Sequence, residues 1–221
     1  MAIKKSELYS SLSASCDELN LLERPAWFRT EHSCCFHLLG LDHRRVFDSR
    51  RLRLFGKRYP LYHYSWQDAY GNASLNVASL GRFHPDAMLR TVGDYCEFYY
   101  GLSRNLMVRP EAVWRQYMTR VDLPDGLTRT GFADYCQRRN VFKSTNQLYD
   151  FPDMIEGVIE RGAYPDQMRL LICDEAQDMS PLQWQLVEMW ASHAEEFYVA
   201  GDHLQSIYGF QGATPEGFLN V

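Results

Sequence analysis

Long apolar runs are absent from this sequence. A membrane-spanning helix needs roughly 20 consecutive apolar residues, and no stretch of the chain approaches that length. Near its start, Lys4 and Lys5 are not followed by the continuous apolar stretch of a secretory signal. We therefore expect a cytoplasmic protein with no membrane partner.

Cysteine is sparse and irregularly spaced. The chain has six cysteines and no Cys-x-x-Cys pair, so we expect reduced thiols and not a disulfide framework. His32, Cys34, Cys35 and His37 do lie within six residues of one another. One short helical segment is a poor tetrahedral zinc site and no second ligand pair follows, so a packed helix is favoured over a metal centre.

No strong excess of charge marks the chain as a whole. It has 221 residues, of which 46% are hydrophobic and 23% charged, enough for one core plus a small inserted domain. The net charge of -5 taken alone argues against nucleic acid, but the charge is unevenly distributed. Residues 24–58 carry nine Lys or Arg against three Asp or Glu, whereas residues 150–221 carry two against thirteen. The first region could meet phosphates, and the second could hold metal ions or be a solvated acidic surface.

The secondary-structure signals are clearest from residue 150 onward. Pro152 is expected to open a helix that ends at Gly162. The apolar runs 170–173 and 197–200 predict two strands buried on both faces of a parallel sheet, with a helix capped by Ser180 between them. Strand, helix and strand in this order indicate an α/β domain.

The sequence Leu-Leu-Ile-Cys-Asp-Glu-Ala-Gln-Asp, residues 170–178, places two carboxylates directly after a predicted strand. Ligands of open α/β sheets bind at that edge. Asp174 could hold a hydrated Mg²⁺, and Glu175 could take a proton from an attacking water, as in the Walker B element of nucleotide hydrolases. An isolated Asp-Glu pair would more simply be an acidic loop that caps the next helix.

The pair is not isolated. Residues 174–183, Asp-Glu-Ala-Gln-Asp-Met-Ser-Pro-Leu-Gln, and residues 199–213, which begin Val-Ala-Gly-Asp, resemble motifs II and III of superfamily 1 DNA helicases of the UvrD/Rep/PcrA type. Residues 27–33, Trp-Phe-Arg-Thr-Glu-His-Ser, resemble the Thr-x-His-Ser segment of that family. Residues 149–154, Tyr-Asp-Phe-Pro-Asp-Met, resemble the segment with which such a chain returns from a helical insertion.

The resemblance implies a fold and a division of the chain. The fold would be α/β, a partial P-loop NTPase (RecA-like) parallel sheet with a mainly helical inserted subdomain. Residues 1–48 would form the N-terminal part of the RecA-like domain and residues 49–148 the insertion. Residues 149–221 would form its C-terminal part, with motifs II and III.

The resemblance also implies roles at an ATP site. Asp174 would position Mg²⁺, Glu175 would be the general base, and Gln205 would sense the γ-phosphate of ATP. Three further residues would couple the nucleotide to movement: Gln177, Asp178 and Asp202.

Single-stranded DNA is the partner that the resemblance implies. Thr30 and His32 would touch its backbone. Tyr208 and Phe210 would lie near its bases, on which aromatic rings can stack without reading sequence.

A phosphate-binding loop, G-x-x-x-x-G-K-[ST], is missing from the sequence. The only Gly-Lys pair is Gly56-Lys57, with Arg51 and Arg58 where the motif needs Gly and Ser or Thr. We therefore expect a fragment of an ATP-dependent DNA helicase or translocase that cannot hydrolyse ATP alone. Two alternatives stay open: a non-catalytic DNA- or protein-binding module, and one half of a split helicase whose ATP site is completed by a second chain or further domains.

A basic run follows the Thr-x-His-Ser segment. Its members are Arg44, Arg45, Arg50, Arg51, Arg53, Lys57 and Arg58. Such a run is ordinarily a solvated face, but in a family that tracks along DNA a role in contacting phosphates becomes about equally plausible.

Overall fold

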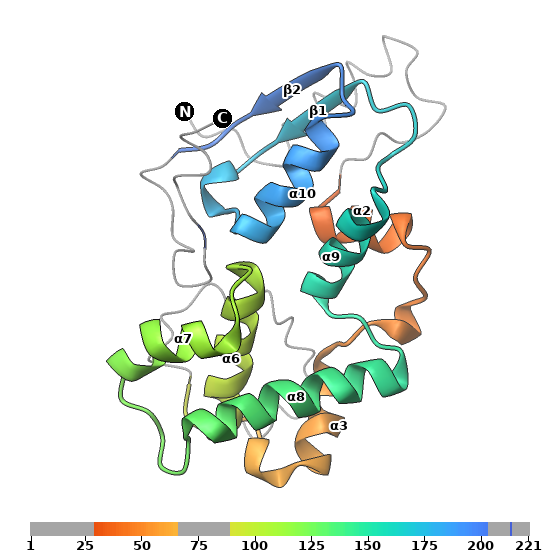
Figure 1. Ribbon diagram of the computed structural model, residues 1–221. Coiled ribbons are helices and arrows are strands. Elements are labelled where there is room, and N and C mark those ends of the chain that lie inside the picture. The colour runs from red at the N-terminus through yellow and green to blue at the C-terminus, as the bar shows by residue number, and fades with distance from the viewer. Residues whose placement is uncertain (1–28, 66–88, 203–212, 214–221) are drawn as a thin grey trace.

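The computed structural model describes residues 29–65, 89–202 and 213, and it combines many helices with two short strands (Figure 1). The α-helices are α2 (Glu31–Leu38), α3 (Ser49–Arg58), α6 (Val92–Asn105), α7 (Pro110–Gln116), α8 (Arg129–Asn146), α9 (Phe151–Arg161) and α10 (Pro181–Ala191). The single-turn 3-10 helices are η1 (His43–Arg45), η2 (Pro60–Tyr62), η4 (Met118–Arg120) and η5 (Ala176–Asp178). No described helix is both long and apolar enough to cross a membrane.

The strands β1 (Leu170–Cys173) and β2 (Glu196–Val199) pair in parallel, with Leu170 opposite Glu196 and Cys173 opposite Val199. Helix α10 connects them, so the predicted strand–helix–strand order is confirmed. The start of α10 is also as predicted. The Ser180 side chain accepts a hydrogen bond from the Gln183 backbone, and Gln183 Oε1 accepts one from the Ser180 N–H.

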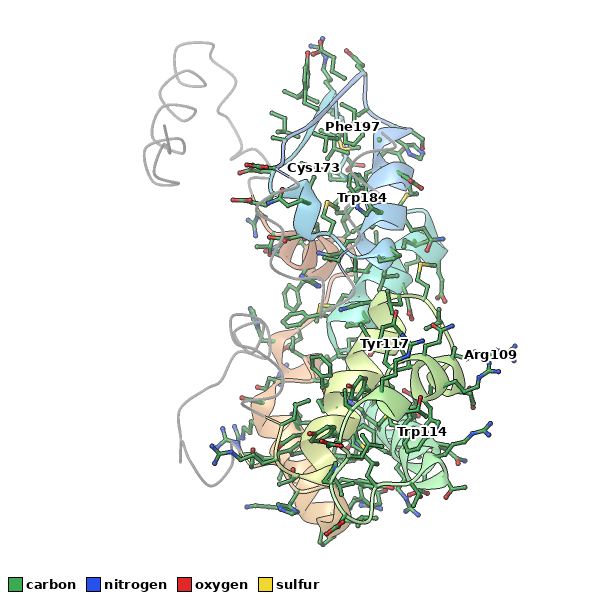
Figure 2. The ribbon with its side chains drawn as sticks, turned by 90° about the vertical axis from the view of Figure 1, so that its left-hand side faces the viewer. Arg109, Trp114, Tyr117, Cys173, Trp184 and Phe197 are labelled. Atoms are coloured by element: carbon green, nitrogen blue, oxygen red, sulfur yellow. The ribbon has the colours of Figure 1, made fainter. Side chains whose placement is uncertain are left out.

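The expectation that both strands are buried on both faces is wrong. Leu170, Ile172 and Tyr198 share one face of the sheet and are 50%, 52% and 58% exposed. The other face is covered, because α10 packs along it. Its side chains, near the labelled Cys173, Trp184 and Phe197 in Figure 2, form a small core: Leu171, Cys173, Phe197 and Val199 against Ala176, Met179, Trp184 and Val187. Side chains alternate between the faces of a strand, so a sheet covered by one helix buries only every second residue.

Helix α9 ends as the sequence predicts. It begins at Phe151, Asp150 caps it in a reciprocal box with Asp153, and it ends at Gly162 with φ of +57°. It packs against α2 and α10 around a second core that includes Cys34, Cys35, Met154, Ile155, Val158, Leu182, Leu186 and Trp190. We call β1, β2, α2, α9 and α10 the sheet lobe.

The remaining helices α3, α6, α7 and α8 enclose a separate aromatic core, and we call them the helical lobe (Figure 1). Phe55 of α3 lies edge-on to Tyr135 of α8, with ring centroids 5.6 Å apart. Helix α7 begins at Pro110 and ends at Gln116; Tyr117 after it is exposed, while Val113 and Met118 are buried.

The chain enters and leaves the helical lobe at one place. The Phe47 N–H donates to the Tyr149 carbonyl at 2.8 Å, and the Tyr149 N–H donates to the Arg45 carbonyl at 2.7 Å. Val46 and Tyr149, which are 103 positions apart in sequence, therefore form a parallel bridge at the boundary between the lobes.

Buried charges reinforce this boundary. Arg139 of α8 is 3% exposed and donates from Nη2 to Glu97 Oε1 at 2.7 Å and from Nη1 to Asp150 Oδ2 at 2.6 Å. Lys143 Nζ donates to the same Asp150 oxygen at 2.6 Å and to Asp153 at 2.7 Å. The residue that caps α9 is thus held by two cations of α8. These cations keep the pKa of the Asp150 carboxyl below its usual range, although burial alone would raise it.

Candidate functional site

The two carboxylates that follow β1 lie at its C-terminal end, and both side chains are exposed. Asp174 Oδ1 accepts a hydrogen bond from the Glu175 N–H at 3.0 Å. Glu175 has φ of +57°, a left-handed conformation that non-glycine residues seldom adopt. Its carbonyl accepts from the Asp178 N–H at 3.0 Å, which closes the turn of η5. The strand exit is therefore a tight turn that presents both carboxylates to solvent.

Gln177 connects this turn to the end of the neighbouring strand. Its side chain is buried, with 1% of the residue exposed. Nε2 donates to Glu175 Oε2 at 2.8 Å, and Oε1 accepts from the Asp202 N–H at 2.9 Å. One buried amide therefore links the carboxylate after β1 to the backbone after β2. A polar group buried this deeply is stabilised by having both ends hydrogen-bonded.

Gly201 makes this link possible, and sequence reasoning missed it. A Cβ at position 201 would lie 2.5 Å from Gln177 Oε1 and 3.3 Å from the Ala176 nitrogen. The Ala176 N–H also donates to the Ala200 carbonyl at 3.0 Å, so the two strand exits touch through their backbones. The available signal was a glycine directly after a strand, which often marks a close backbone approach.

The Thr-x-His-Ser segment forms the start of α2. The Thr30 side chain is the N-cap and accepts from the Ser33 N–H at 3.3 Å. Glu31, which the sequence did not single out, accepts from Gln183 Nε2 of α10 at 3.3 Å. This contact brings the start of α2 to the start of α10, which follows the two carboxylates in the chain.

His32 is half-buried, and its ring packs against the beginning of α9. Its ring lies 4.7 Å from the ring of Phe151, at the beginning of α9. Burial lowers the pKa of His32, and the nearby carboxylates of Glu31 and Asp150 only partly oppose that effect. The imidazole is therefore favoured in its neutral form, which can still donate a hydrogen bond but carries no charge for a phosphate.

The cysteines beside His32 belong to the core. Burial raises the pKa of the Cys34 thiol to about 11 and that of Cys35 to about 12. Burial and the charge of Glu31 likewise raise the pKa of Cys173 to about 12. Thiols so far from ionisation are poor metal ligands and poor nucleophiles. In the part of the chain that the structure describes, no group of three or more His, Cys, Asp or Glu side chains is placed to hold a metal ion.

Asp174 and Glu175 fit the metal-binding half of a site for Mg²⁺ and a nucleotide. Mg²⁺ keeps several waters and is commonly held by one or two carboxylates together with phosphate oxygens, so the exposed pair Asp174 and Glu175 suits it. Gly56 and Lys57 lie inside α3, and Gly56 is buried. The only Gly-Lys pair of the chain is therefore helical and does not form a phosphate-binding loop.

The structure brings together five of the ten predicted site residues. Asp174, Glu175, Gln177 and Asp202 meet at the carboxyl ends of the two strands, and Asp178 closes the same turn. Three other predicted site residues lie outside the described residues: Gln205, Tyr208 and Phe210.

Comparison with known proteins identifies the family of the sequence. The sequence model of the UvrD/REP helicase N-terminal domain matches residues 108–221. The ATP-dependent DNA helicase Rep of Buchnera aphidicola is 28% identical over 98 residues, which are 41% of this chain and 15% of that protein. The ATP-dependent DNA helicase UvrD2 of Mycobacterium bovis is 35% identical over 81 residues, 33% of this chain and 12% of that protein.

A longer match extends over the helical lobe. The ATP-dependent DNA helicase PcrA of Staphylococcus aureus is 26% identical over 203 residues, 88% of this chain and 25% of that protein. The matched parts thus span a quarter or less of the length of these relatives. The resemblance seen in the motifs is confirmed, and the family match covers more than half of the residues. The chain belongs to the UvrD/REP helicase N-terminal domain family.

Proposed function

We propose that this chain supplies the metal-and-base side of the ATP site of a superfamily 1 helicase or translocase that acts on single-stranded DNA in the cytoplasm. The observation that carries the proposal is the Gln177 amide, which joins Glu175 to the Asp202 backbone across two parallel strands. Walker B carboxylates sit at this edge of a nucleotide-binding sheet. The fold is then a partial RecA-like sheet, with residues 1–48 and 149–221 in that domain and 49–148 inserted. The separate cores of the two lobes support this division.

Each residue then has a chemical task. Asp174 holds Mg²⁺ through its exposed carboxylate, and Glu175 accepts a proton from the attacking water. Mg²⁺, when bound, neutralises charge on the β- and γ-phosphates of ATP. Gln177 transmits a change at Glu175 to the segment after β2, with Asp178 and Asp202 at its two ends. Gln205 senses the γ-phosphate.

The DNA side of the proposal lies at the start of α2. Thr30 is exposed and bonds the phosphate backbone of a single strand through its hydroxyl. His32 donates a neutral hydrogen bond, since its pKa is lowered. Tyr208 and Phe210 supply stacking surfaces for bases.

Residues 1–221 contain no phosphate-binding loop, so the chain by itself is proposed not to turn over ATP. Backbone N–H groups and a lysine must cradle the β- and γ-phosphates, and they would come from a second chain or another part of a longer helicase. ATP turnover by the purified chain that disappears in Glu175→Gln would contradict this.

Metal binding tests the carboxylate site directly. Mn²⁺ is titrated into the chain and free Mn²⁺ is followed by electron paramagnetic resonance. We expect a site that is lost in Asp174→Asn and kept in Asp166→Asn, an exposed acidic control in the loop before β1. Equal Mn²⁺ binding by both variants would overturn the assignment of Asp174.

Binding of single-stranded DNA tests the part of the proposal that concerns DNA contact. Anisotropy of a labelled 20-mer across a salt series should show binding that weakens with salt and is reduced in Thr30→Ala. Absence of binding at low salt, together with intact Mn²⁺ binding, would leave a nucleotide-site fragment without a DNA surface. Binding of DNA without any Mn²⁺ site would favour a non-catalytic DNA-binding module.

A further inference from the structure

The side chain of Gln183 joins the start of α10 to the start of α2. Its Oε1 accepts hydrogen bonds from the Ser180 N–H at 3.0 Å and from the Ser180 hydroxyl at 2.9 Å, which completes the cap of α10. Its Nε2 donates to Glu31 Oε2 at 3.3 Å. One amide therefore links the first turns of two helices, through residues that are 152 positions apart in sequence.

Both helix starts adjoin residues of the proposed sites. Glu31 follows Thr30, the exposed N-cap of α2 to which the proposed function assigns a DNA contact. Ser180 lies just after η5, the single turn that closes the exit of β1. The charge of Glu31 also contributes to the raised pKa of Cys173, the last residue of β1 before Asp174. The Glu31 carboxylate therefore lies within electrostatic reach of the strand exit while it adjoins the DNA-contacting segment.

The segment between the two carboxylates and α10 is short, hydrogen-bonded and buried. The Glu175 carbonyl accepts from the Asp178 N–H at 3.0 Å, and the Ala176 carbonyl accepts from the Met179 N–H at 3.2 Å. Ala176, Met179 and Ser180 are each at most 3% exposed. A close-packed interior has few voids into which such a segment could relax. A displacement of the carboxylates would therefore move the start of α10 as well.

The length of the contact between Gln183 and Glu31 makes it sensitive to such a movement. N–H···O hydrogen bonds are commonest near about 2.9 Å and extend to about 3.2 Å. At 3.3 Å this contact lies at the long end of that range. A shift of about 0.3 Å at the start of α10 would strengthen or break it. A contact that changes with the state of one site can carry that change to another site.

We propose that Glu31 is a positioning residue that, through Gln183, couples the metal site after β1 to the single-strand contact at Thr30. The proposal rests on the proposed function, because it needs both sites, and it gives Glu31 a role that neither site includes. In this role Glu31 sets the position of the Thr30 hydroxyl and does not itself bind the metal or the DNA. Occupancy of the metal site would then change the affinity for single-stranded DNA.

The test exchanges the two side chains of the contact. Gln183→Glu keeps an acceptor for the Ser180 cap, because Gln and Glu both serve at this position of a capping box, but it places two carboxylates against each other. Addition of Glu31→Gln restores a donor opposite an acceptor, with the hydrogen bond reversed, and returns the net charge to its original value. Gln185→Glu adds the same charge at an exposed position of α10 and is the matched control.

The measured quantity is the ratio of the dissociation constants of a labelled single-stranded 20-mer without and with saturating Mn²⁺. Asp174→Asn, which lacks the proposed metal site, gives the background ratio that arises from Mn²⁺ on the DNA itself. Coupling between two sites typically changes an affinity by about 5- to 150-fold. We expect at least about a fivefold effect above background in the unsubstituted chain, in Gln185→Glu and in the exchanged double variant. In Gln183→Glu the ratio should fall to the background.

A merely structural contact would change DNA affinity equally with and without Mn²⁺ and would leave the ratio unaltered. An unaltered ratio in Gln183→Glu would therefore overturn the proposal, as would a ratio in the unsubstituted chain that does not exceed the background. Failure of the exchanged variant to restore the ratio would overturn it too. If circular dichroism shows that Gln183→Glu does not fold, Glu31→Ala removes the same contact without adding charge and is measured in its place.

Failure of this proposal is distinguishable from failure of the proposed function. Mn²⁺ binding that is lost in Asp174→Asn and DNA binding that is reduced in Thr30→Ala test the two sites separately. If both results hold while Gln183→Glu keeps its ratio, only the role of Glu31 fails. If the chain binds no Mn²⁺ or no single-stranded DNA, the proposed function fails and the coupling fails with it.

Discussion

Replacement of Arg139 by methionine should strongly destabilise the fold at the boundary between the lobes. Its guanidinium is 4% exposed and bonds both Glu97 and Asp150. Its carbon also lies 4.3 Å from the centroid of the Tyr100 ring and 4.5 Å from that of Phe47. Methionine fills similar space without the charge, so the change isolates the ionic contribution.

The expected loss of stability arises because the carboxylates of Glu97 and Asp150 stay buried when Arg139 is replaced. Removal of one partner of a buried ion pair typically costs about 3 to 5 kcal/mol, because the remaining charge stays buried without compensation. Asp150 retains Lys143 at 2.6 Å and its capping bonds, which reduces the loss. Glu97 keeps only the hydroxyl of Tyr135 among its described partners. We therefore expect a free energy of unfolding lower by about 3 kcal/mol.

The neighbouring residue provides a matched control. Arg138 pairs with Asp134 at 2.6 Å, but the two side chains are 46% and 41% exposed. Water screens such a pair, so Arg138→Met should leave the urea midpoint unchanged. Urea unfolding followed by tryptophan fluorescence and circular dichroism measures both variants at equal protein concentration.

A second substitution tests the cause of the loss. Glu97→Gln removes one of the two carboxylates that Arg139→Met leaves without a partner. The free energy of unfolding lost in the double variant should therefore be smaller than the sum of the losses in the two single variants. A loss below about 1 kcal/mol in Arg139→Met, the range of an exposed pair, would refute the reasoning. Strict additivity in the double variant would show that the two side chains do not interact.

Gly93→Ala should unfold α6, because its Cβ would lie 2.2 Å from the His63 carbonyl oxygen, whereas Gly101→Ala in the same helix meets nothing within 4 Å and should raise the thermal midpoint. The pKa of His32 is lowered by burial, so the unfolded chain takes up the proton first. Stability should be full above about pH 6.5 and decrease as pH falls through the folded pKa, with a smaller decrease in His32→Gln; equal pH profiles would contradict this. Cys35, with a pKa of about 12, should resist Ellman's reagent at pH 8 until urea unfolds the chain; rapid labelling of the native protein would contradict its burial.

The segment from residue 150 shows how far local sequence signals reach. The capping residue Ser180, the stop at Gly162 and the two strands were all predictable, because caps and strand runs depend on neighbours in sequence. The exposure of Leu170, Ile172 and Tyr198 was not predictable. It depends on how many layers cover the sheet, which no local pattern encodes.

The candidate site also has features that the sequence predicted and features that it did not. Residue types and the resemblance of two motifs together predicted Asp174 and Glu175 as site residues, which an isolated pair of carboxylates would not have done. They did not reveal that Gln177 reaches Asp202 or that Gly201 leaves room for it. Those contacts join positions about 25 residues apart, and only the parallel pairing of the two strands brings them together.

The helical lobe is the part of the protein about which the sequence predicted least. Its sequence indicated several helices and a basic run, and it provided no residue of obvious function between about 59 and 148. The tertiary structure gathered Glu97 of α6, Arg139 of α8 and the α9 N-cap Asp150 into one buried cluster, and it left Arg50, Lys57 and Arg58 of α3 exposed.

Residues close together in the chain encode the family resemblance, the two carboxylates and the ends of α9 and α10. The fold established which face of the sheet is covered, which amide bridges the strands and which charges are buried. These features depend on contacts between segments distant in sequence, and their energies come from the loss of water around groups that the local pattern cannot locate.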